Sequence, residues 1–307
     1  MRTVVQQSFG GPEVLELVEA ERPQPGDGEV LVRVHASAIN PVDTAVRSGA
    51  FPLLGEPPFA LGWDISGVVE EVGAGAGFAV GDEVYGMPSF PAQAAGYSEY
   101  VVARADQLAA KPAAVDHVHA AAVPLAALTA WQGLVEGAGI KAGDRVVVHR
   151  AAGGVGHFAV QIAKARGAHV IALASEARHA FLRELGADEL VDSRAVDFAT
   201  VLSDVDVILD SNAEGERSLS VLRLGGVLVT ILEHRDQELA AKVEAAGRRF
   251  VGISVEPDGA ALAEIAALIE QGKIRPHVSE VLPLAEVGKA HQLVEAGHAQ
   301  GKIVLSV

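Results

Sequence analysis

Val146-Val147-Val148-His149-Arg150-Ala151-Ala152-Gly153-Gly154-Val155-Gly156 is the stretch that specifies the architecture of this chain. An apolar strand runs into a glycine turn, and the turn opens a helix with one apolar face. Gly153 and Gly154 let the backbone approach a pyrophosphate, and Gly156 allows the helix to pack closely on the strand. Free N–H groups at the helix start attract the phosphates. The stretch therefore predicts a dinucleotide-binding loop, with a plain tight turn as the alternative, because Ala151 replaces the first glycine of the usual fingerprint.

The alternation of strand and helix continues along the chain after the loop. Short apolar runs predict strands at 145–149, 170–174, 205–209, 226–231 and 250–253. Helical patterns fall at 155–166, 178–185, 217–222 and 236–246. This order is typical of βαβ units. We therefore expect an α/β chain with a Rossmann domain, a doubly wound parallel sheet with helices on both faces.

The first hundred residues follow a different pattern, in which glycine and proline interrupt short strands. The period of two over Val30–Ala36 is typical of a half-buried strand. The region predicts a partly open, barrel-like β-domain. Strands expected at 278–282 and 303–307 would return the chain to this domain. We therefore expect one domain from residues 1–115 and 272–307, and the sheet domain from residues 116–271.

The composition restricts what the protein does. The 307 residues include 24 Lys and Arg against 40 Asp and Glu, for a formal net charge of −16. A surface this acidic repels phosphate backbones and anionic lipids, so we expect neither nucleic acid nor a membrane as a partner. The absence of cysteine excludes disulfides, cysteine-ligated zinc, iron–sulfur clusters and a catalytic thiol. The sequence shows no signal-peptide pattern and no apolar run of about 18 residues, so we expect a cytoplasmic protein.

The residues after the second Rossmann strand indicate which dinucleotide would bind. Ser175 is a neutral donor at the end of that strand, and Arg178 follows in the next turn. Both side chains suit a 2′-phosphate, whereas an acid in place of Ser175 would hold the ribose hydroxyl of NAD. We therefore predict NADPH as the cofactor. Two alternatives stay open: Glu176 would favour NAD if it turned inward, and Ser175 would also serve as a helix N-cap.

Four segments outside the loop carry a resemblance to a known family. They are Asn40-Pro41-Val42-Asp43, Gly62-Trp63-Asp64-Ile65-Ser66-Gly67, Leu128-Thr129-Ala130-Trp131 and Gly301-Lys302-Ile303-Val304-Leu305. Together with the loop, they resemble the zinc-free, quinone-oxidoreductase-like branch of the medium-chain dehydrogenase/reductase superfamily. The resemblance implies a GroES-like catalytic domain from the two chain ends and a Rossmann domain between them. It also implies an active site in the cleft between the domains, and a homodimer joined through the edges of the cofactor domains.

The resemblance also bears on metal binding. Zinc members of the superfamily hold their catalytic metal through Cys, His and a third Cys or acidic ligand. The matching positions here are Asn40, Trp63 and a position near Leu125, and none of them can act as that ligand. The histidines show no metal-binding spacing. We therefore expect no metal.

Without a metal, hydrogen-bond donors would polarise a substrate carbonyl, while the cofactor supplies the hydride. The resemblance makes Asn40 the candidate donor, with a loop-capping role as the alternative, and makes Asp43 a second catalytic candidate or a loop residue. Phe51 and Trp63 would line an apolar substrate pocket, unless Trp63 fills the core instead. Arg150, where a small residue is usual, would reach either a phosphate or only solvent. The cofactor-binding candidates are Thr129, Ala152, Gly153, Gly154, Val155, Ser175, Arg178, Asn212 and Lys302.

These observations lead to one main hypothesis, an NADPH-dependent reductase of quinones or α,β-unsaturated carbonyl compounds. An enoyl (double-bond) reductase is its nearest variant, since both reactions deliver hydride to a conjugated system. A cofactor-bound protein with little turnover and an NAD-dependent alcohol oxidation are the alternatives. The expected partner is a small quinone or enone molecule.

Overall fold

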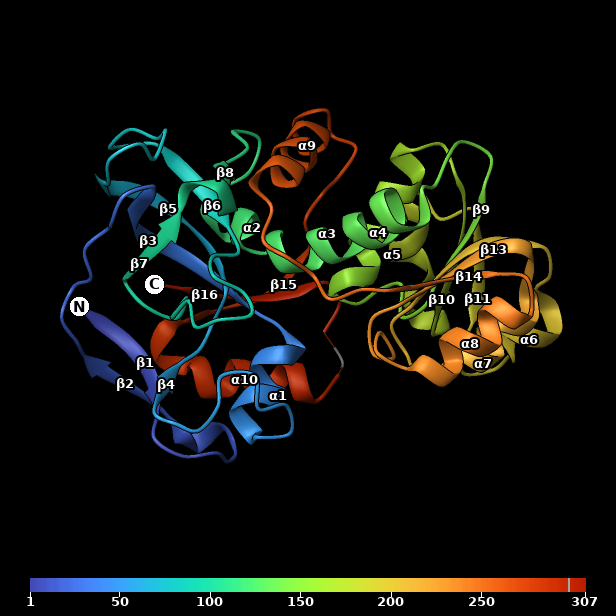
Figure 1. Ribbon diagram of the computed structural model, residues 1–307, viewed down its shortest axis with the longest axis horizontal. Helices are drawn as coiled ribbons and strands as arrows, with labels where there is room; N and C mark the ends of the chain where they lie inside the picture. Colours follow the sequence, from blue (N-terminus) through green and yellow to red (C-terminus); the bar gives the residue numbers. More distant parts are fainter. Residues whose placement is uncertain (298) are drawn as a thin grey trace. The chain divides into compact units, whose positions relative to one another are not determined.

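The computed structural model describes residues 1–297 and 299–307, and these residues form two compact units (Figure 1). Unit 1 comprises Met1–Leu128, Glu256–Gln271 and Pro276–Val307. Unit 2 comprises Thr129–Val255 and Gly272–Arg275. Both ends of the chain, blue and red in Figure 1, therefore belong to unit 1.

Unit 1 is built on a mostly antiparallel, barrel-like sheet. The strand order is β15 (Val278–Pro283), β16 (Lys302–Ser306), β3 (Glu29–Ile39), β5 (Asp64–Val72), β6 (Glu83–Gly86) and β8 (Leu108–Ala110), and β7 (Tyr100–Arg104) also pairs with β3. A smaller sheet has the order β2 (Leu15–Glu19), β1 (Arg2–Gln6) and β4 (Phe59–Ala60). Val30, Val32 and Val34 point into one core with Ile65 and Val69, as the period of two predicts. The barrel-like prediction is confirmed.

The helices of unit 1 cover and connect these strands. They are α1 (Pro41–Ser48), α2 (His117–Ala121), α3 (Pro124–Trp131, which continues into unit 2), α9 (Gly259–Glu270), α10 (Val287–Glu295) and the 3₁₀ turns η1 (Pro12–Val14), η2 (Ala105–Gln107) and η5 (Leu284–Glu286). Local sequence sets the ends of α1. Asn40 is its N-cap, Pro41 occupies the first turn, and Gly49 ends the helix with a left-handed φ of 83°.

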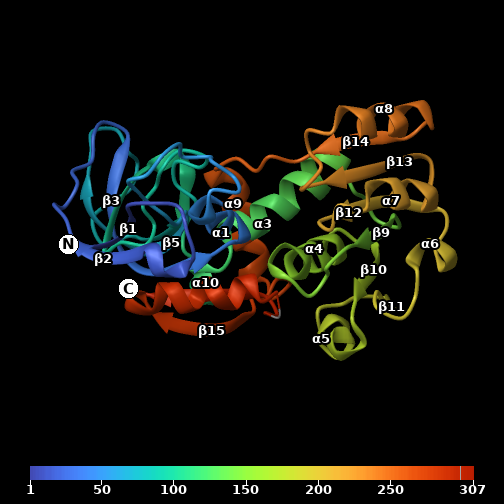
Figure 2. The same cartoon turned by 90° about the horizontal axis from the view of Figure 1, so that it is seen from below.

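Unit 2 is a parallel sheet in the order β11-β10-β9-β12-β13-β14, and Figure 2 shows the labelled strands in this order. The strands are β9 (Arg145–Val148), β10 (His169–Ala174), β11 (Glu189–Asp192), β12 (Val205–Asp210), β13 (Leu222–Thr230) and β14 (Arg249–Gly252). The helices are η3 (Gln132–Ala138, a π-helix), α4 (Gly154–Ala165), η4 (Glu176–Arg178), α5 (His179–Glu184), α6 (Phe198–Val201), α7 (Gly215–Val221) and α8 (Gln237–Ala245). The strand order reverses between β9 and β12, as in a doubly wound sheet, which confirms the Rossmann prediction.

The unit boundaries differ from those expected from the sequence. Residues 116–128 and 256–271 group with unit 1, whereas residues 272–275 group with unit 2. α9 groups with unit 1 because of its tertiary contacts. Tyr85 donates a hydrogen bond to the carbonyl of Leu262 (2.6 Å), and Gly259 lies against the backbone of Leu108. β11 was not among the strands expected from the sequence. Within the described residues, no helix combines the length and apolarity that crossing a membrane requires.

Candidate functional site

The candidate phosphate loop joins β9 to α4 in unit 2. β9 ends at Val148, and α4 begins at Gly154 with Gly153 as its N-cap. A hydrogen bond from the N–H of Gly153 to the carbonyl of Arg150 (2.8 Å) closes the turn. The first N–H groups of a helix have no intrahelical acceptor, so this end of α4 attracts an anion. The candidates at positions 152–155 lie together at this helix start.

The backbone packs so closely at Gly156 that only glycine fits. A Cβ there would lie 2.4 Å from the carbonyl oxygen of Arg150 and 2.6 Å from the Cα of Ala151. Gly153 is less crowded, since a Cβ would lie 3.2 Å from the same oxygen. Arg150 itself is exposed and has a φ of 47°, a conformation that costs a residue with a Cβ about 1–2 kcal/mol. The helix therefore packs on the turn as the glycine pattern predicted, and a strained turn places a cation directly before the loop.

Residues after β10 lie at the same edge of the sheet as the loop. β9 lies between β10 and β12 and is parallel to both, so the carboxyl ends of the three strands meet at one edge. Ser175 directly follows β10, is half-buried, and makes no side-chain capping hydrogen bond. Arg178 is half-buried at the end of η4, and Glu176 is exposed. The neutral hydroxyl and the guanidinium expected to select a 2′-phosphate therefore share an edge with the phosphate loop.

The end of β12 completes this edge. Asp210 is fully buried and accepts backbone hydrogen bonds from Asn212 (2.7 Å) and Glu214 (2.8 Å), which fixes the loop that carries the exposed Asn212. Nδ1 of His149 lies 3.3 Å from a carboxylate oxygen of Glu214 and 3.6 Å from one of Asp210. Burial lowers the pKa of His149, although both carboxylates act to raise it. Asp210 therefore positions Asn212 from within the sheet.

In unit 1, Asn40 lies in a buried polar cluster. Asn40 follows β3 directly and is only 2% exposed. Its Nδ2 donates to a carboxylate oxygen of Asp64 (2.9 Å), and its Oδ1 accepts from Nζ of Lys302. Lys302 also forms an ion pair with Asp64 (3.2 Å). Burying this ion pair costs desolvation free energy. The hydrogen bonds among Asn40, Asp64 and Lys302 offset that cost.

Asp43 supports this cluster from α1. Its Oδ2 accepts the backbone N–H of Asn40 (2.6 Å), and the side chain is fully buried. Burial raises the pKa of Asp43 to about 7; the Asn40 hydrogen bond and Lys302 oppose this rise, and Asp64 adds to it. Asp43 Oδ1 and the Tyr97 hydroxyl are near enough to shift each other's pKa, yet neither has a partner with hydrogen-bond geometry among the described residues. The structure therefore shows Asp43 in the loop-holding position, acting through the Asn40 backbone.

The two expected pocket residues have different surroundings. Trp63 is fully buried; its indole N–H donates to the carbonyl of Ala92 (2.7 Å), and its ring meets Phe90 edge-on. Trp63 therefore fills the core of unit 1, which is the second of the two roles expected for it from the sequence. Phe51 follows α1 and is 38% exposed, so its ring is accessible.

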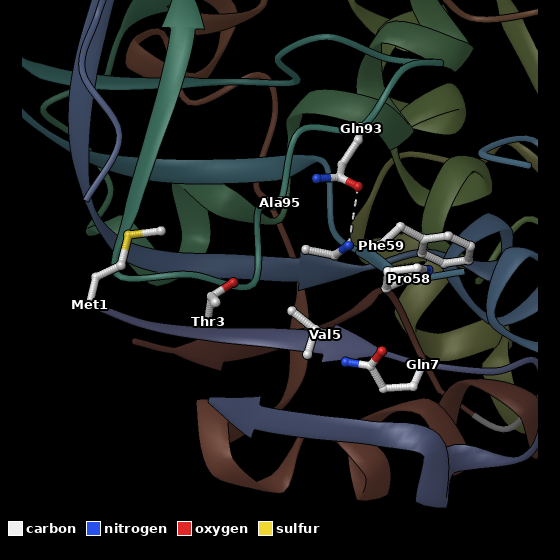
Figure 3. A pocket seen from close by; sticks show the side chains of 9 residues that line it. Met1, Thr3, Val5, Gln7, Pro58, Phe59, Gln93 and Ala95 are labelled. Carbon is white, nitrogen blue, oxygen red and sulfur yellow. Dashed lines mark hydrogen bonds between the residues drawn. The ribbon is translucent and has the colours of Figure 1, made fainter. Parts of the chain in front are cut away.

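A cavity of about 330 Å³ lies elsewhere in unit 1, over β1 and β4 (Figure 3). Its lining includes Met1, Val5, Phe59 and Gln93, and Gln93 accepts a hydrogen bond from the backbone of Ala60 (3.2 Å). None of the lining residues is a site candidate from the sequence, and none has a charged side chain.

Comparison with known proteins agrees with both parts of this architecture. Residues 26–113 match the alcohol dehydrogenase GroES-like domain, and residues 185–305 match the zinc-binding dehydrogenase family. A quinone oxidoreductase of Pongo abelii is 33% identical over 330 residues, which cover 99% of this chain and 97% of the relative. The chain belongs to the medium-chain dehydrogenase/reductase family. Within it, the chain falls in the quinone-oxidoreductase-like branch.

Solved structures of this medium-chain dehydrogenase/reductase branch have the same fold. The quinone oxidoreductase from Coxiella burnetii superposes with a TM-score of 0.93 and is 34% identical, covering 100% of this chain and 99% of that one. The Escherichia coli quinone oxidoreductase, solved in complex with NADPH, superposes with a TM-score of 0.88 and is 30% identical, covering 100% of both chains. The fold class and the family expected from the sequence are therefore confirmed.

One matching family is described as zinc-binding, but this medium-chain dehydrogenase/reductase lacks suitable ligands at the corresponding positions. The amide of Asn40 is engaged by Lys302 and Asp64. The indole of Trp63 donates to a backbone carbonyl, and Leu125 is apolar. Within residues 1–297 and 299–307, no three His, Asp or Glu side chains cluster as metal ligands would. The donor set therefore does not fit zinc.

The expected site residues fall into one group in each unit. The loop, Ser175, Arg178 and Asn212 share the sheet edge of unit 2, while Thr129, in α3, is 3% exposed. Lys302, expected among the cofactor contacts, lies against Asn40 in unit 1. Asp64, which holds the Asn40 amide, was not among the site residues expected from the sequence. An acid directly after Trp63, at the start of an apolar strand, is the signal that could have revealed it.

Proposed function

We propose that this protein is an NADPH-dependent oxidoreductase that delivers hydride to quinones or α,β-unsaturated carbonyl compounds without zinc. Unit 2 would bind the cofactor, and unit 1 would supply the catalytic groups. The observation that carries the proposal is the phosphate loop, where Gly156 fits against the turn as no larger residue could. When bound, the nicotinamide would supply the hydride. The chain's residues would bind the cofactor, orient the substrate and polarise its carbonyl group.

The preference for NADPH rests on the sheet edge beside the loop. The hydroxyl of Ser175 is not used for capping, and Arg178 supplies a positive charge in the following turn. Glu176, the residue that would favour NAD, is exposed. The Escherichia coli relative was solved with NADPH, which supports the same choice.

The catalytic contribution would come from the edge of the Asn40 amide. A carbonyl oxygen gains negative charge as hydride arrives, so a fixed N–H donor stabilises the transition state more than the ground state. Asn40 is 2% exposed, so only one edge of its amide would meet the substrate. Asp43 would hold the backbone at Asn40, and Phe51 would offer an apolar contact.

Steady-state oxidation of NADPH tests this proposal. The purified protein is assayed against a panel of quinones, enones and enoyl thioesters, with NADH in parallel and metal content measured on the same sample. We expect acceptor-dependent oxidation of NADPH that survives chelation. Tight NADPH binding with no turnover on any acceptor would show a cofactor-binding protein instead. Faster turnover with NADH and an alcohol–ketone pair would favour alcohol oxidation. We also expect a homodimer, which light scattering would measure.

A further inference from the structure

Charged residues from the two neighbouring strands hold the Asn40 side chain from both sides. β3 lies between β16 and β5 in the sheet of unit 1. The antiparallel register pairs Ile303 with Ile39, so Lys302, at the start of β16, lies opposite Asn40. Asp64, at the start of β5, lies diagonally across from Asn40 on the other side. The sheet topology therefore places a cation and an anion on opposite flanks of one amide.

These charges determine which way the amide faces. Oδ1 of Asn40 accepts from the ammonium of Lys302, and Nδ2 donates to the carboxylate of Asp64 (2.9 Å). A reversed amide would turn its NH₂ toward the ammonium and its carbonyl toward the carboxylate, and both contacts would be repulsive. Asp64 is held in turn, because its other oxygen accepts the backbone N–H of Leu125 (2.7 Å).

One N–H group of the Asn40 side chain is left without a hydrogen-bond acceptor among the described residues. An asparagine amide has two N–H groups, and the bond to Asp64 uses one of them. The second N–H of Asn40 has no acceptor in the described part of the chain. Because both ends of the amide take part in charge-assisted hydrogen bonds, its orientation is set before any substrate arrives.

We infer that Lys302 and Asp64 are positioning residues, which hold Asn40 so that its remaining N–H is a single, directed donor to the substrate carbonyl oxygen. The inference rests on the proposed function, in which Asn40 polarises that oxygen. Lys302 and Asp64 are 3% and 0% exposed and act through Asn40. The inference thus gives Lys302 a positioning role in place of the expected cofactor contact.

Three variants test whether Lys302 positions Asn40, binds the cofactor or only balances the charge of Asp64. Lys302→Met removes the cation that faces Oδ1 of Asn40, and Lys302→Arg is the conservative control. Lys302→Met leaves the Asp64 carboxylate buried without its cation, which lowers stability. The double variant Asp64→Asn/Lys302→Met therefore removes both charges, so that the fold can be compared without an unpaired one.

We expect Lys302→Met to lower kcat by at least about tenfold while the NADPH dissociation constant changes by less than about threefold. Lys302→Arg should recover part of kcat. The double variant should regain thermal stability but not kcat, because the two charges that orient the amide are then gone, and a neutral amide at position 64 can meet either end of Asn40. Recovery of both kcat and stability in the double variant would overturn the inference, as would an unchanged kcat in Lys302→Met. A weakened NADPH affinity with normal kcat would show instead that Lys302 serves the cofactor.

A readout in the cofactor-free protein separates this inference from the proposed function. The side-chain ¹H–¹⁵N signals of Asn40 are assigned by their loss in Asn40→Ser, and the exchange of the two amide hydrogens is measured. We expect one hydrogen, bound to Asp64, to exchange at least about tenfold more slowly than the other. The difference should vanish in the double variant. Equal exchange in the wild-type protein would refute the positioning, whereas a wild-type protein that orients Asn40 yet oxidises no NADPH would refute only the proposed function.

Discussion

Replacing Gly153 and Gly156 separately by alanine distinguishes packing of the loop from binding by the loop. A Cβ at Gly156 would meet three backbone atoms of Arg150 and Ala151 at 2.4, 2.6 and 2.7 Å. Overpacking of this kind costs about 1–3 kcal/mol, and the better helix propensity of alanine returns only about 0.5–1 kcal/mol. We therefore expect Gly156→Ala to lower the free energy of unfolding by about 1–2 kcal/mol and also to weaken cofactor binding, because the turn must shift.

Gly153→Ala should behave differently. Its φ is −81°, which alanine adopts freely, and its Cβ would approach only the Arg150 oxygen, at 3.2 Å. The free energy of unfolding should change by less than about 0.5 kcal/mol. The methyl group would nevertheless occupy the space that a pyrophosphate needs, so the NADPH dissociation constant should rise at least about tenfold, or about 1.4 kcal/mol.

Urea unfolding of the cofactor-free protein and calorimetric titration with NADPH measure the two quantities. Gly26→Ala is a matched control, since its Cβ would lie 3.3 Å from a Glu29 carboxylate oxygen, in unit 1. It should leave the NADPH affinity unchanged. Wild-type NADPH affinity in Gly153→Ala would refute the proposal that this loop holds a pyrophosphate.

Three further predictions concern charge and strain. Ser175→Asp should raise the NADPH dissociation constant at least about tenfold relative to that of NADH, because a carboxylate repels the 2′-phosphate; competition titration measures the ratio, and an unchanged ratio would place the 2′-phosphate elsewhere. Arg150→Gly should raise the free energy of unfolding in urea by about 1 kcal/mol, because glycine adopts the φ of 47° without strain; a loss of stability would contradict this. Burial raises the pKa of Asp43 to about 7, while the carboxyl of the unfolded chain titrates near 4. Between these two pH values the folded protein keeps Asp43 protonated and the unfolded chain does not. The folded state therefore loses stability as pH rises from about 4 to about 7. Asp43→Asn should lack this loss, so its stability relative to wild type should increase over that range by up to about 4 kcal/mol and stay constant above it; a pH-independent difference would refute the shift.

The architecture was largely predictable because its signals are local. The alternation around Val30 and the strand–turn–helix pattern at 146–156 each lie within one stretch of chain, and both elements formed as expected. The boundaries of the units were less predictable. The periodicity of α9 is compatible with packing on either unit, and contacts with Tyr85 and Leu108 place it in unit 1.

The site divides in the same way. The turn and helix start of the candidate phosphate loop could be located from the sequence, because glycine spacing and a helix start act over a few neighbouring residues. The surroundings of Asn40 could not, because Lys302 is 262 positions away and reaches it only when β16 pairs with β3. Whether Trp63 lines a pocket or fills the core, and whether Asp43 is charged at neutral pH, likewise depend on burial. Burial is a property of the packed molecule, since it arises when strands from distant parts of the chain exclude water from the same side chains.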